Sequence, residues 1–567
     1  MTDNRNMILA IVLSALVLFG WSALSDRYFP TATPPSTKIV DGKQVPLPQP
    51  GAAPVAATTS ALRDRRIVLA EAPRVRIETP NVQGSINLKG ARIDDLVLTR
   101  QRETIAKDSP PVRLLSPAGA VDAYYATFGW TGDGLTVPGP DTLWTASGDR
   151  LTPTTPVTLS WSNEQGQRFD IQLSVDDKYM FTARQTVSNT ATGAVAVRPY
   201  SLVTRATASK DPTSWTMHVG PVGVFNGAAN YKIDYKDLGA EGDERFTSTG
   251  GWLGFGDKYW LTALAPDQRA GVEATFRRGP NGSFQADVTP APVIVAPGKA
   301  SRYESHFFAG AKEVSLLDHY ETDLGISQFD MAIDWGWFRW FMIPIFYVLD
   351  WLFRTLGNFG VAIVCLTVIV RGLMFPIAQK QFHSMAGMRV VQPKMKALQE
   401  RYKDDKPRLQ QEMLKLYQEE KVNPMAGCLP ILLQIPIFYA LYKVLMLTVE
   451  MRHEPFILWI KDLSAPDPLT PVNLFGFLPF TPPGFLAIGI LPILLGITMF
   501  IQFRLQPVQD PIQRQVFGLM PWVMMFIMAP FAAGLQLYWT VSNILTIAQQ
   551  KWLYSRHPGL QASAEVK

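Results

Sequence analysis

The sequence predicts a multi-domain membrane protein in which an all-β domain precedes an α-helical transmembrane bundle. Two observations predict this: charged, alternating sequence fills the first half of the 567 residues, and long uncharged apolar runs fill the rest. This split excludes a single globular domain, and the 47% hydrophobic content excludes a disordered chain. A net charge of +5 in so long a chain does not indicate nucleic acid binding.

The first apolar run extends from Met7 to Leu24 and is long enough to cross a bilayer. We interpret residues 1–27 as a transmembrane anchor, because the run is longer than the apolar part of most signal peptides. A cleaved signal peptide stays open as the alternative, since Ala23-Leu24-Ser25 supplies small residues suited to cleavage. Residues 28–64 are rich in Pro, Ala, Thr and Ser, which predicts a flexible spacer.

Residues 65–318 are predicted to form a large antiparallel β-sandwich. Apolar residues stand at every second position in Arg74–Glu78 and Phe169–Val175, which is typical of strands buried on one face. Turn signals such as Asn281-Gly282 recur between these segments, and almost no stretch has a helical period. Helical sequence begins only near Ser315.

Residues 319–356 are predicted to connect the two parts as an interfacial helical segment, because their second half is aromatic-rich but interrupted by charges. A bundle follows over residues 357–553. One helix over Val516–Ala548, which holds no charge, would measure about 50 Å against a hydrocarbon core of about 30 Å. Pro530 and Gly534 therefore mark a turn. Together with the anchor we predict six spans, the later five at residues 359–378, 427–447, 485–503, 516–531 and 532–550.

Basic residues between the predicted spans give the orientation. Residues 379–426 carry ten Lys and Arg residues, whereas Glu450–Gly484 carries only Arg452 and Lys461. The positive-inside rule places the first segment in the cytoplasm and the second outside. Both termini, including the short tail 554–567, are then cytoplasmic. The β-domain lies outside, which is the periplasm in a bacterium with two membranes.

The basic segment 379–426 is itself predicted to be a cytoplasmic helical hairpin. Methionines and leucines form one apolar stripe on each helix, and Lys403–Pro407 forms the turn. A solvated charged face over a two-helix stripe explains most of this pattern. The methionines also suit adaptable contacts with apolar partners. The candidate contact residues are Met385, Met388, Arg389 and Lys394.

Arg371 is the most informative residue, because it stands inside an otherwise apolar span. A guanidinium near mid-helix costs about 2.5–3.5 kcal/mol on insertion scales. Thr367 lies one helical turn earlier, and no other predicted span holds an acidic residue near the same depth. We predict a water-filled cavity open to the cytoplasm. A snorkelling arginine, or one paired with a neighbouring carboxylate, stays open as the alternative.

Other predicted spans contribute uncharged polar residues that would line the same cleft. Their alternative role is hydrogen bonding between helices, which is common in membrane bundles. The residues are Gln434, Gln536, Thr540, Ser542 and Asn543.

Signatures of familiar enzymes are missing from the sequence. It contains no Gly-x-x-x-x-Gly-Lys-Ser/Thr phosphate loop and no Gly-x-Ser-x-Gly nucleophile motif. The six histidines are scattered without metal-ligand spacing. We therefore predict no catalytic residues, no metal and no cofactor, and do not expect an enzyme.

Several motifs between Trp335 and Trp552 resemble the YidC/Oxa/Alb family of membrane insertases. They combine an intramembrane arginine, a helical hairpin and a span marked by Pro and Gln, in that order. The motifs are Thr367-Val-Ile-Val-Arg371-Gly372, Glu420-Lys421-Val422-Asn423-Pro424, Gly427-Cys428-Leu429-Pro430, Gln434-Ile435-Pro436 and Val541-Ser542-Asn543.

The resemblance implies a membrane protein insertase and chaperone of the bacterial inner membrane, with a periplasmic β-super-sandwich as in Gram-negative members. It implies five core helices around a hydrophilic groove, with Arg371 and Thr367 in the groove. Tyr538 and Trp539 fall where relatives carry a substrate-contacting Tyr-Tyr pair. The implied partners are nascent membrane proteins, the lipid bilayer, and the Sec translocon with its accessory subunits. The ribosome and the signal-recognition-particle pathway are also compatible, although the tail after Trp552 is short and weakly basic.

Two other functional classes stay open on the sequence alone. A secondary transporter also places a charge in a cavity, but it usually shows inverted repeats, and no matching halves are seen here. A membrane-anchored carbohydrate-binding or epimerising domain is the second alternative, although no paired catalytic carboxylates can be named.

Overall fold

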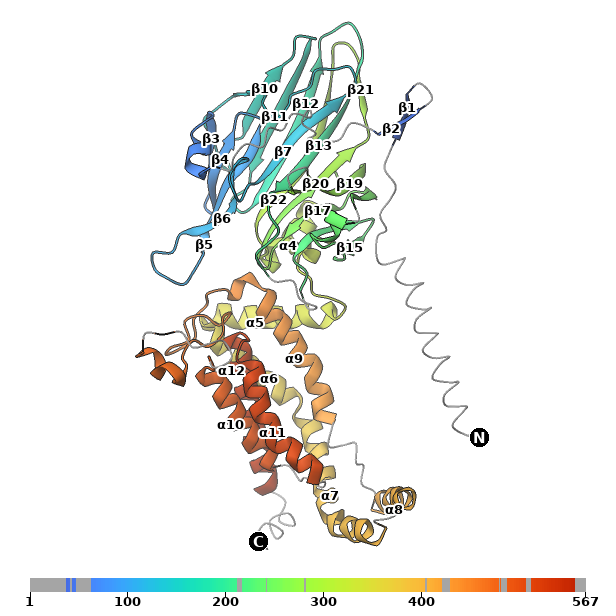
Figure 1. Cartoon of the computed structure of the whole chain (residues 1–567), viewed down its shortest axis with the longest axis vertical. Helices are drawn as coiled ribbons and strands as arrows, with labels where there is room; N and C mark the ends of the chain where they lie inside the picture. The colour runs from blue at the N-terminus through green and yellow to red at the C-terminus, as the bar shows by residue number, and fades with distance from the viewer. Residues whose placement is uncertain are drawn as a thin grey trace. The chain divides into compact units, whose positions relative to one another are not determined.

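The structure, a computed structural model, describes residues 37–40, 43–46, 63–211, 217–240, 242–279, 282–402, 405–420, 429–478, 480, 487–505 and 511–555. The chain divides into two compact units, Met1–Asp334 and Trp335–Lys567. The first unit consists mainly of strands and the second of helices (Figure 1).

Two large sheets face each other in the first unit, which confirms the predicted large β-rich domain. One sheet has nine strands in the order β15-β14-β17-β18-β22-β12-β11-β10-β8. The other has eleven, in the order β16-β19-β20-β13-β7-β5-β4-β3-β9, with β21 beside β13 and β6 beside β5. Neighbouring strands are antiparallel except β3 and β9, which pair in parallel. Figure 1 shows β7 and β13 of the larger sheet overlying β11 and β12 of the smaller one.

The strands of the two sheets have the following bounds. They are β3 (Arg74–Glu78), β4 (Val82–Asn87), β5 (Arg92–Arg102), β6 (Pro111–Leu115), β7 (Tyr124–Gly132), β8 (Thr145–Ala146), β9 (Arg150–Leu151), β10 (Val157–Ser162), β11 (Gln167–Val175), β12 (Met180–Asn189), β13 (Val195–Arg205), β14 (Gly220–Phe225), β15 (Ala228–Asn230), β16 (Glu244–Thr249), β17 (Trp252–Gly256), β18 (Trp260–Ala265), β19 (Gly271–Arg278), β20 (Phe284–Pro290), β21 (Val293–Val295) and β22 (Lys299–Ala311). A separate hairpin pairs β1 (Thr37–Val40) with β2 (Lys43–Pro46).

The core of this unit lies between the two sheets. Alternate residues of β11 point inward and are buried, as its two-residue period predicts. Aromatic rings then meet across the gap: the ring centroids of Phe128 and Phe307 lie 6.4 Å apart, and those of Trp130 and Phe169 lie 5.1 Å apart. The side-chain amide of Gln185 also crosses it, donating to the Gly129 carbonyl at 2.7 Å.

Short helices complete the first unit: α2 (Arg65–Leu69), α3 (Asp237–Ala240), α4 (Val314–Asp323) and the 3₁₀ helix η1 (Phe329–Ala332). The last two follow β22 and pack back on its sheet, where Phe329 meets Phe308 with centroids 5.5 Å apart. The indole of Trp252 donates to the Gln328 carbonyl at 3.3 Å. These contacts fix the chain where it leaves the strands.

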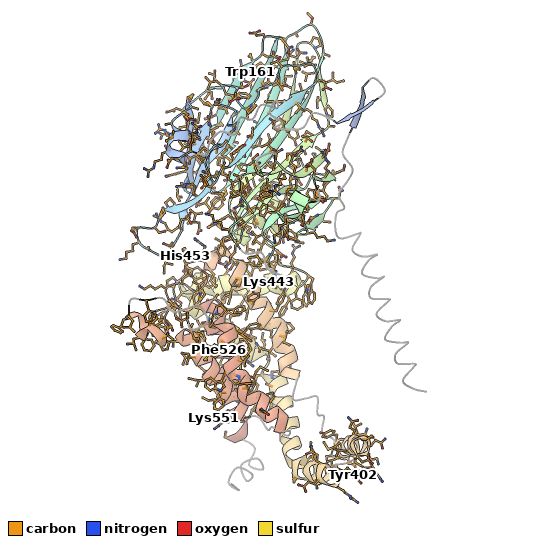
Figure 2. All side chains as sticks on the ribbon, in the orientation of Figure 1. Trp161, Tyr402, Lys443, His453, Phe526 and Lys551 are labelled. Carbon is orange, nitrogen blue, oxygen red and sulfur yellow. The ribbon has the colours of Figure 1, made fainter. Side chains whose placement is uncertain are left out.

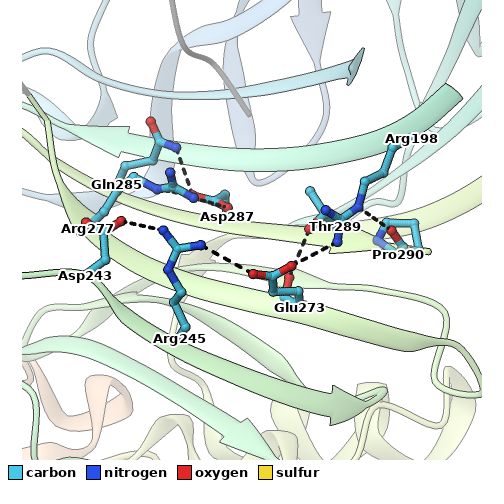
Figure 3. Close-up of polar contacts among 9 residues, drawn as sticks. All are labelled: Arg198, Asp243, Arg245, Glu273, Arg277, Gln285, Asp287, Thr289 and Pro290. Carbon is cyan, nitrogen blue, oxygen red and sulfur yellow. Dashed lines mark hydrogen bonds and ion pairs between the residues drawn. The ribbon is translucent and has the colours of Figure 1, made fainter. Parts of the chain in front are cut away.

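A ladder of ion pairs crosses four neighbouring strands of the larger sheet (Figure 3). Glu273 on β19 accepts from Arg198 on β13 at 3.1 Å and from Arg245 on β16 at 3.4 Å. Arg277, also on β19, contacts Asp287 on β20 at 2.8 Å. Because Asp287 is only 1% exposed, its charge is matched inside the protein rather than by water.

Lys312, just after β22, is buried, with only 4% of the residue exposed. Burial lowers the pKa of Lys312 from 10.5 to about 8, and the nearby carboxylates of Asp257, Asp334 and Asp211 only partly offset this loss of hydration. The folded unit therefore favours the neutral amine more strongly than the unfolded chain does.

The second unit contains eight helices among the described residues. They are α5 (Arg339–Leu356), α6 (Phe359–Leu373), α7 (Phe375–Arg401), α8 (Lys406–Glu419), α9 (Leu429–Leu447), α10 (Ile490–Leu505), α11 (Pro511–Met528) and α12 (Ala533–Ser555). Two short 3₁₀ helices, η3 (Val449–Met451) and η4 (Pro471–Gly476), lie between α9 and α10. Figure 2 places Lys443 and His453 at one end of this unit and Tyr402 and Lys551 at the other.

Local sequence explains the helix ends. Gly357 adopts φ 69° after α5, and the Asn358 side chain then accepts from the Val361 amide at 3.0 Å to cap α6. Asp405 caps α8 in the same way, two residues before Pro407 in the first turn. The hairpin of α7 and α8 closes on a small apolar cluster. It contains Met395, Leu398, Met413 and Leu416 of the predicted stripes, and also Val391 and Tyr417, which the stripes did not include.

The helices differ in places from the predicted spans. α6 ends at Leu373, five residues before the end of the predicted span, since Met374 and Pro376 interrupt the run. α11 and α12 are separated at residues 529–532, next to the predicted turn. Lys443, near the end of α9, is only 2% exposed. Within the described residues, no helix has both the length and the apolarity required to cross a bilayer, so the six spans stay predictions.

The shifted pKa of Lys312 predicts how the stability of the β-unit depends on pH. The unfolded chain binds this proton up to about pH 10.5 and the folded chain only to about pH 8, so the free energy of unfolding should rise between these values. The rise should reach about 3 kcal/mol at about 1.4 kcal/mol per pKa unit. Lys312→Met should abolish it in urea unfolding of a 63–334 fragment. Lys299→Met, at the exposed start of β22, should retain it, and an unchanged pH slope in Lys312→Met would refute the assignment.

Candidate functional site at Arg371

Arg371 lies near the end of α6, about 18 Å along the axis from Phe359. Its guanidinium Nε donates to the hydroxyl of Ser542 on α12 at 3.0 Å, and Nη2 contacts the same oxygen. Ser542 is 1% exposed. Among the described residues no carboxylate forms an ion pair with Arg371. The charge is therefore held by a neutral hydroxyl, which satisfies its geometry without neutralising it.

A second hydrogen bond joins α9 to the same face of α12. The Gln434 side-chain amide donates to the Tyr538 hydroxyl at 2.6 Å. Tyr538 is 1% exposed and stands one helical turn before Ser542, so both residues share one face of α12. We call Arg371, Gln434, Tyr538 and Ser542 the Arg371 cluster. It brings polar groups from three helices together.

Three other predicted site residues lie near this cluster in the sequence but contact other groups. The Thr367 hydroxyl donates to the Ile363 carbonyl of its own helix at 2.7 Å, and the residue is fully buried. The Trp539 ring packs on Phe438 of α9 with centroids 4.7 Å apart. The Asn543 amide donates to the Thr498 hydroxyl of α10 at 3.2 Å. Asn543 thus forms the interhelical bond that was the alternative role for these polar residues.

Gln536 is placed at the turn between α11 and α12. Its amide donates to the carbonyl of Met528, the last residue of α11, at 2.9 Å and to the carbonyl of Phe531, in the connection to α12, at 2.8 Å. It therefore satisfies carbonyls that a helix end leaves unpaired. Its own Oε1 has no hydrogen-bond partner among the described residues, and neither has the Thr540 hydroxyl one turn later.

The predicted hairpin contacts are placed only in part. Lys394 on α7 is exposed and forms an ion pair with Glu420, just after α8. This pair holds the two helices of the hairpin together at the surface. Met385, Met388 and Arg389 lie within α7, but their side chains are outside the described residues.

The hydrogen-bond partners in the Arg371 cluster could not be assigned from the sequence. Ser542 was grouped with other polar residues of its span, and nothing distinguished it as the partner of Arg371. The available signal is spacing, since Tyr538 and Ser542 stand one helical turn apart and therefore share one face of a helix.

Two family models match the chain, one for each unit. The model described as YidC periplasmic domain matches residues 74–348, and the model described as 60Kd inner membrane protein matches residues 351–560. A membrane protein insertase YidC from Zymomonas mobilis is 51% identical over 562 residues, which cover 98% of this chain and 96% of that relative. The chain belongs to the YidC family. A YidC from Rhizobium johnstonii is 45% identical, again over 98% of this chain and 96% of its own length.

Members of the YidC family are inner-membrane insertases with a periplasmic domain, and the β-unit described above is that domain in this chain. A solved structure titled as an active YidC insertase with its first transmembrane domain resolved is 18% identical, with a TM-score of 0.36, and covers 85% of this chain and 95% of its own. The assignment to the YidC family rests on the sequence relatives. It confirms the family resemblance found from the motifs.

The bond between Gln434 and Tyr538 should contribute to the stability of the helical unit. Gln434→Leu and Tyr538→Phe together should show a coupling of about 0.5–1.5 kcal/mol, because each single change removes the same hydrogen bond. The measurement is a double-mutant cycle on thermal unfolding of the detergent-solubilised chain. Gln434→Leu combined with Asn543→Leu is the control, since those two side chains bond to different partners and should be additive. Additive behaviour of the first pair would contradict the geometry.

Proposed function

We propose that this protein inserts nascent inner-membrane proteins into the bilayer and helps them fold. Its family supports the general activity, and the Arg371 cluster supports the way in which we propose that it works. The single observation that carries the proposal is a guanidinium bonded to a neutral hydroxyl in a helical bundle. Such a charge remains available to an acidic group of another chain.

We propose the topology that the basic residues indicate, with six spans, both termini in the cytoplasm and the β-unit in the periplasm. In this orientation α6 starts at the periplasmic side, so Arg371 lies in the inner half of the bilayer. The hairpin of α7 and α8, whose segment 379–426 carries ten Lys and Arg residues, faces the cytoplasm. A client segment would meet this hairpin first.

The proposed groove lies around the Arg371 cluster and opens toward the cytoplasm. Gln536 Oε1 and the Thr540 hydroxyl are two further buried polar atoms of α12 that have no partner among the described residues. A buried polar atom without a hydrogen bond costs about 1–3 kcal/mol, so water or a client's polar groups stabilise these positions. The Tyr538 and Ser542 hydroxyls lie about 200° around α12 from these two atoms, on the face that meets Gln434 and Arg371, and they are the part of α12 that would line the groove.

The driving force of the proposed reaction is burial of the client's apolar segment. About 20 residues of a new span leave water, at roughly 25 cal/mol per Å² of apolar surface. The polar flank of that span is the costly part, because it must cross the hydrocarbon layer. Pairing with Arg371 lowers the free-energy cost of moving an acidic flank across the hydrocarbon layer, because the low dielectric strengthens the attraction between the two charges.

No chemical reaction is needed in this scheme, so we propose that insertion proceeds without nucleotide hydrolysis, metal or cofactor. The partners we propose are nascent membrane proteins and the lipid bilayer. We further propose that the Sec translocon and its accessory subunits deliver clients. The ribosome and the signal-recognition-particle pathway are additional proposed sources of nascent chains.

Crosslinking tests whether clients pass the Arg371 cluster. A photoreactive residue at Gln434 should crosslink to a ribosome-stalled nascent membrane protein, mainly through the polar flank of its first span. The same probe at Phe526, which is 53% exposed on α11, should give much less crosslinking to that flank. Equal yields from both positions would overturn the proposed path.

Loss of the guanidinium should slow insertion selectively. Arg371→Ala should reduce the insertion of clients with acidic flanks by about tenfold or more, since a charged hydrogen bond contributes about 1.5–3 kcal/mol. Arg371→Lys should restore part of the yield. Clients with uncharged flanks should be affected much less in proteoliposomes.

Arg504→Ala is the matched control, because it removes an exposed arginine at the end of α10 that stacks on Phe500 at 4.7 Å. It should leave insertion of both client types unchanged. An equal loss for acidic and uncharged flanks in Arg371→Ala would show that the arginine supports only the fold.

A further inference from the structure

An exposed apolar tip lies between α9 and α10, away from the Arg371 cluster. It consists of Pro471–Leu478 together with Phe480, and we call these residues the apolar tip. Phe477 is 87% exposed and Leu474 is 55% exposed. Four more large apolar side chains in this short stretch are exposed, namely Val472, Phe475, Leu478 and Phe480. Contiguous apolar surface of this kind marks a contact with a membrane or a protein.

The segment that carries the apolar tip is firmly attached to the helical unit. The backbone amides of Ala533 and Gly534, at the start of α12, donate to the carbonyls of Ala465 at 2.8 Å and Leu463 at 2.9 Å. The Asn358 side chain, at the start of α6, donates to the Phe456 carbonyl at 3.0 Å. The base of the tip therefore sits at the end of the unit where α6 and α12 begin.

Asp467 fixes the point from which the apolar tip projects. Its carboxylate is 5% exposed and accepts from the Trp459 indole at 3.0 Å, the Leu469 amide at 3.0 Å and the Leu491 amide at 2.8 Å. The last of these ties the tip to the first turn of α10, where a negative charge is favourable. The exposure of the tip is thus imposed by a rigid base.

The backbone of the apolar tip is strained at two residues whose side chains are exposed. Leu474 and Phe475 adopt φ values of 51° and 59°, in the left-handed region that bulky residues rarely occupy. Phe475 is held there by its amide, which donates to the Thr470 carbonyl at 3.0 Å. Backbone strain of this kind costs about 1–3 kcal/mol per residue. Because the strained side chains stay exposed instead of packing within the chain, the strain indicates that they contact another partner.

The chemistry of the apolar tip matches lipid. No charged residue occurs from Pro468 to Phe503, whereas protein interfaces usually surround their apolar centre with a polar rim. The flanking helices belong to the part of the chain that matches the inner membrane protein model. Helix α5 leads directly into α6 at the same end. Aromatic side chains are also exposed on α5, at Trp340 (70%) and Trp351 (62%), and just before it, at Trp337 (82%). Aromatic residues of this type gather at membrane interfaces.

We propose that the apolar tip inserts into the interfacial layer of the leaflet that faces the periplasm. Phe475, Phe477 and Phe480 would enter roughly 5–10 Å below the headgroup boundary, while Asp467 and the base stay outside. The tip would fix the depth of α10 in the bilayer. This inference rests on the proposed topology, because that topology puts the starts of α6, α10 and α12 on the periplasmic side.

Depth-dependent fluorescence quenching tests the proposal in proteoliposomes. In a full chain carrying Cys365→Ala and Cys428→Ala, Phe477→Cys is labelled with the fluorophore NBD. Vesicles contain phosphatidylcholine with a nitroxide either near the headgroup or near the end of the acyl chain. We expect strong quenching by the first lipid and weaker quenching by the second. If Phe477→Cys perturbs the fold, Val472→Cys, which is 43% exposed on the same tip, replaces it and should show the same quenching pattern.

Two controls separate this inference from the proposed function. Lys461→Cys, an exposed polar site on the base, should not be quenched by either lipid. Ile497→Cys, with a side chain 41% exposed on α10, should be quenched by the lipid with the deep nitroxide. Quenching at Ile497 without quenching at the tip would overturn the inference alone. Protection of the tip from both lipid and aqueous quenchers would instead assign it to a protein partner, and no quenching at Ile497 would overturn the proposed topology as well.

Discussion

The charge of Arg371 is the constraint on which the helical unit depends. Its guanidinium is bonded to Ser542, a hydroxyl that is itself 1% exposed, so α6 and α12 must keep one relative rotation to preserve the contact. A neutral partner orients a charge but leaves most of its field in place. The bundle therefore keeps a positive electrostatic potential at Arg371. This potential destabilises the fold, but it would attract acidic segments of another chain.

In the β-unit, by contrast, buried arginines are paired with carboxylates. Arg277 meets Asp287 at 2.8 Å, Arg205 meets Asp257 at 2.8 Å, and Arg74 pairs with Asp94. Each of these arginines has a carboxylate of nearly matching burial, and removing one partner would leave the other unpaired in a medium of low dielectric. Pairs of this kind stabilise a fold and have no remaining charge to offer a ligand. Arg371 differs from these structural arginines because no carboxylate among the described residues pairs with it.

The sequence predicted the elements well and their partners poorly. The two-residue period of Phe169–Val175 identifies a strand and its inner face, but the order of the strands in each sheet depends on long-range packing that no local pattern encodes. The hairpin turn was predictable because Asp405 and Pro407 carry a local signal for a helix start. Gln536 was not, since its bonds to the end of α11 require the turn to be formed first. Ser542 was missed as the partner of Arg371 for the same reason: the rotation of α12 against α6 decides which polar group comes within reach.

The Arg371 cluster and the apolar tip follow one physical rule. Each contains a group that lacks a favourable partner within the chain. In the cluster it is a cation without a carboxylate, and in the tip it is a set of phenylalanines held outward on a strained backbone. In both cases the surrounding contacts are specific, through Ser542 for the cation and through Asp467 for the tip. Because each group stands on a rigid support, we propose that its missing interaction is supplied from outside the chain. The positive charge calls for an anionic partner and the phenylalanines for hydrocarbon, so the two groups require different partners at separate sites of the helical unit.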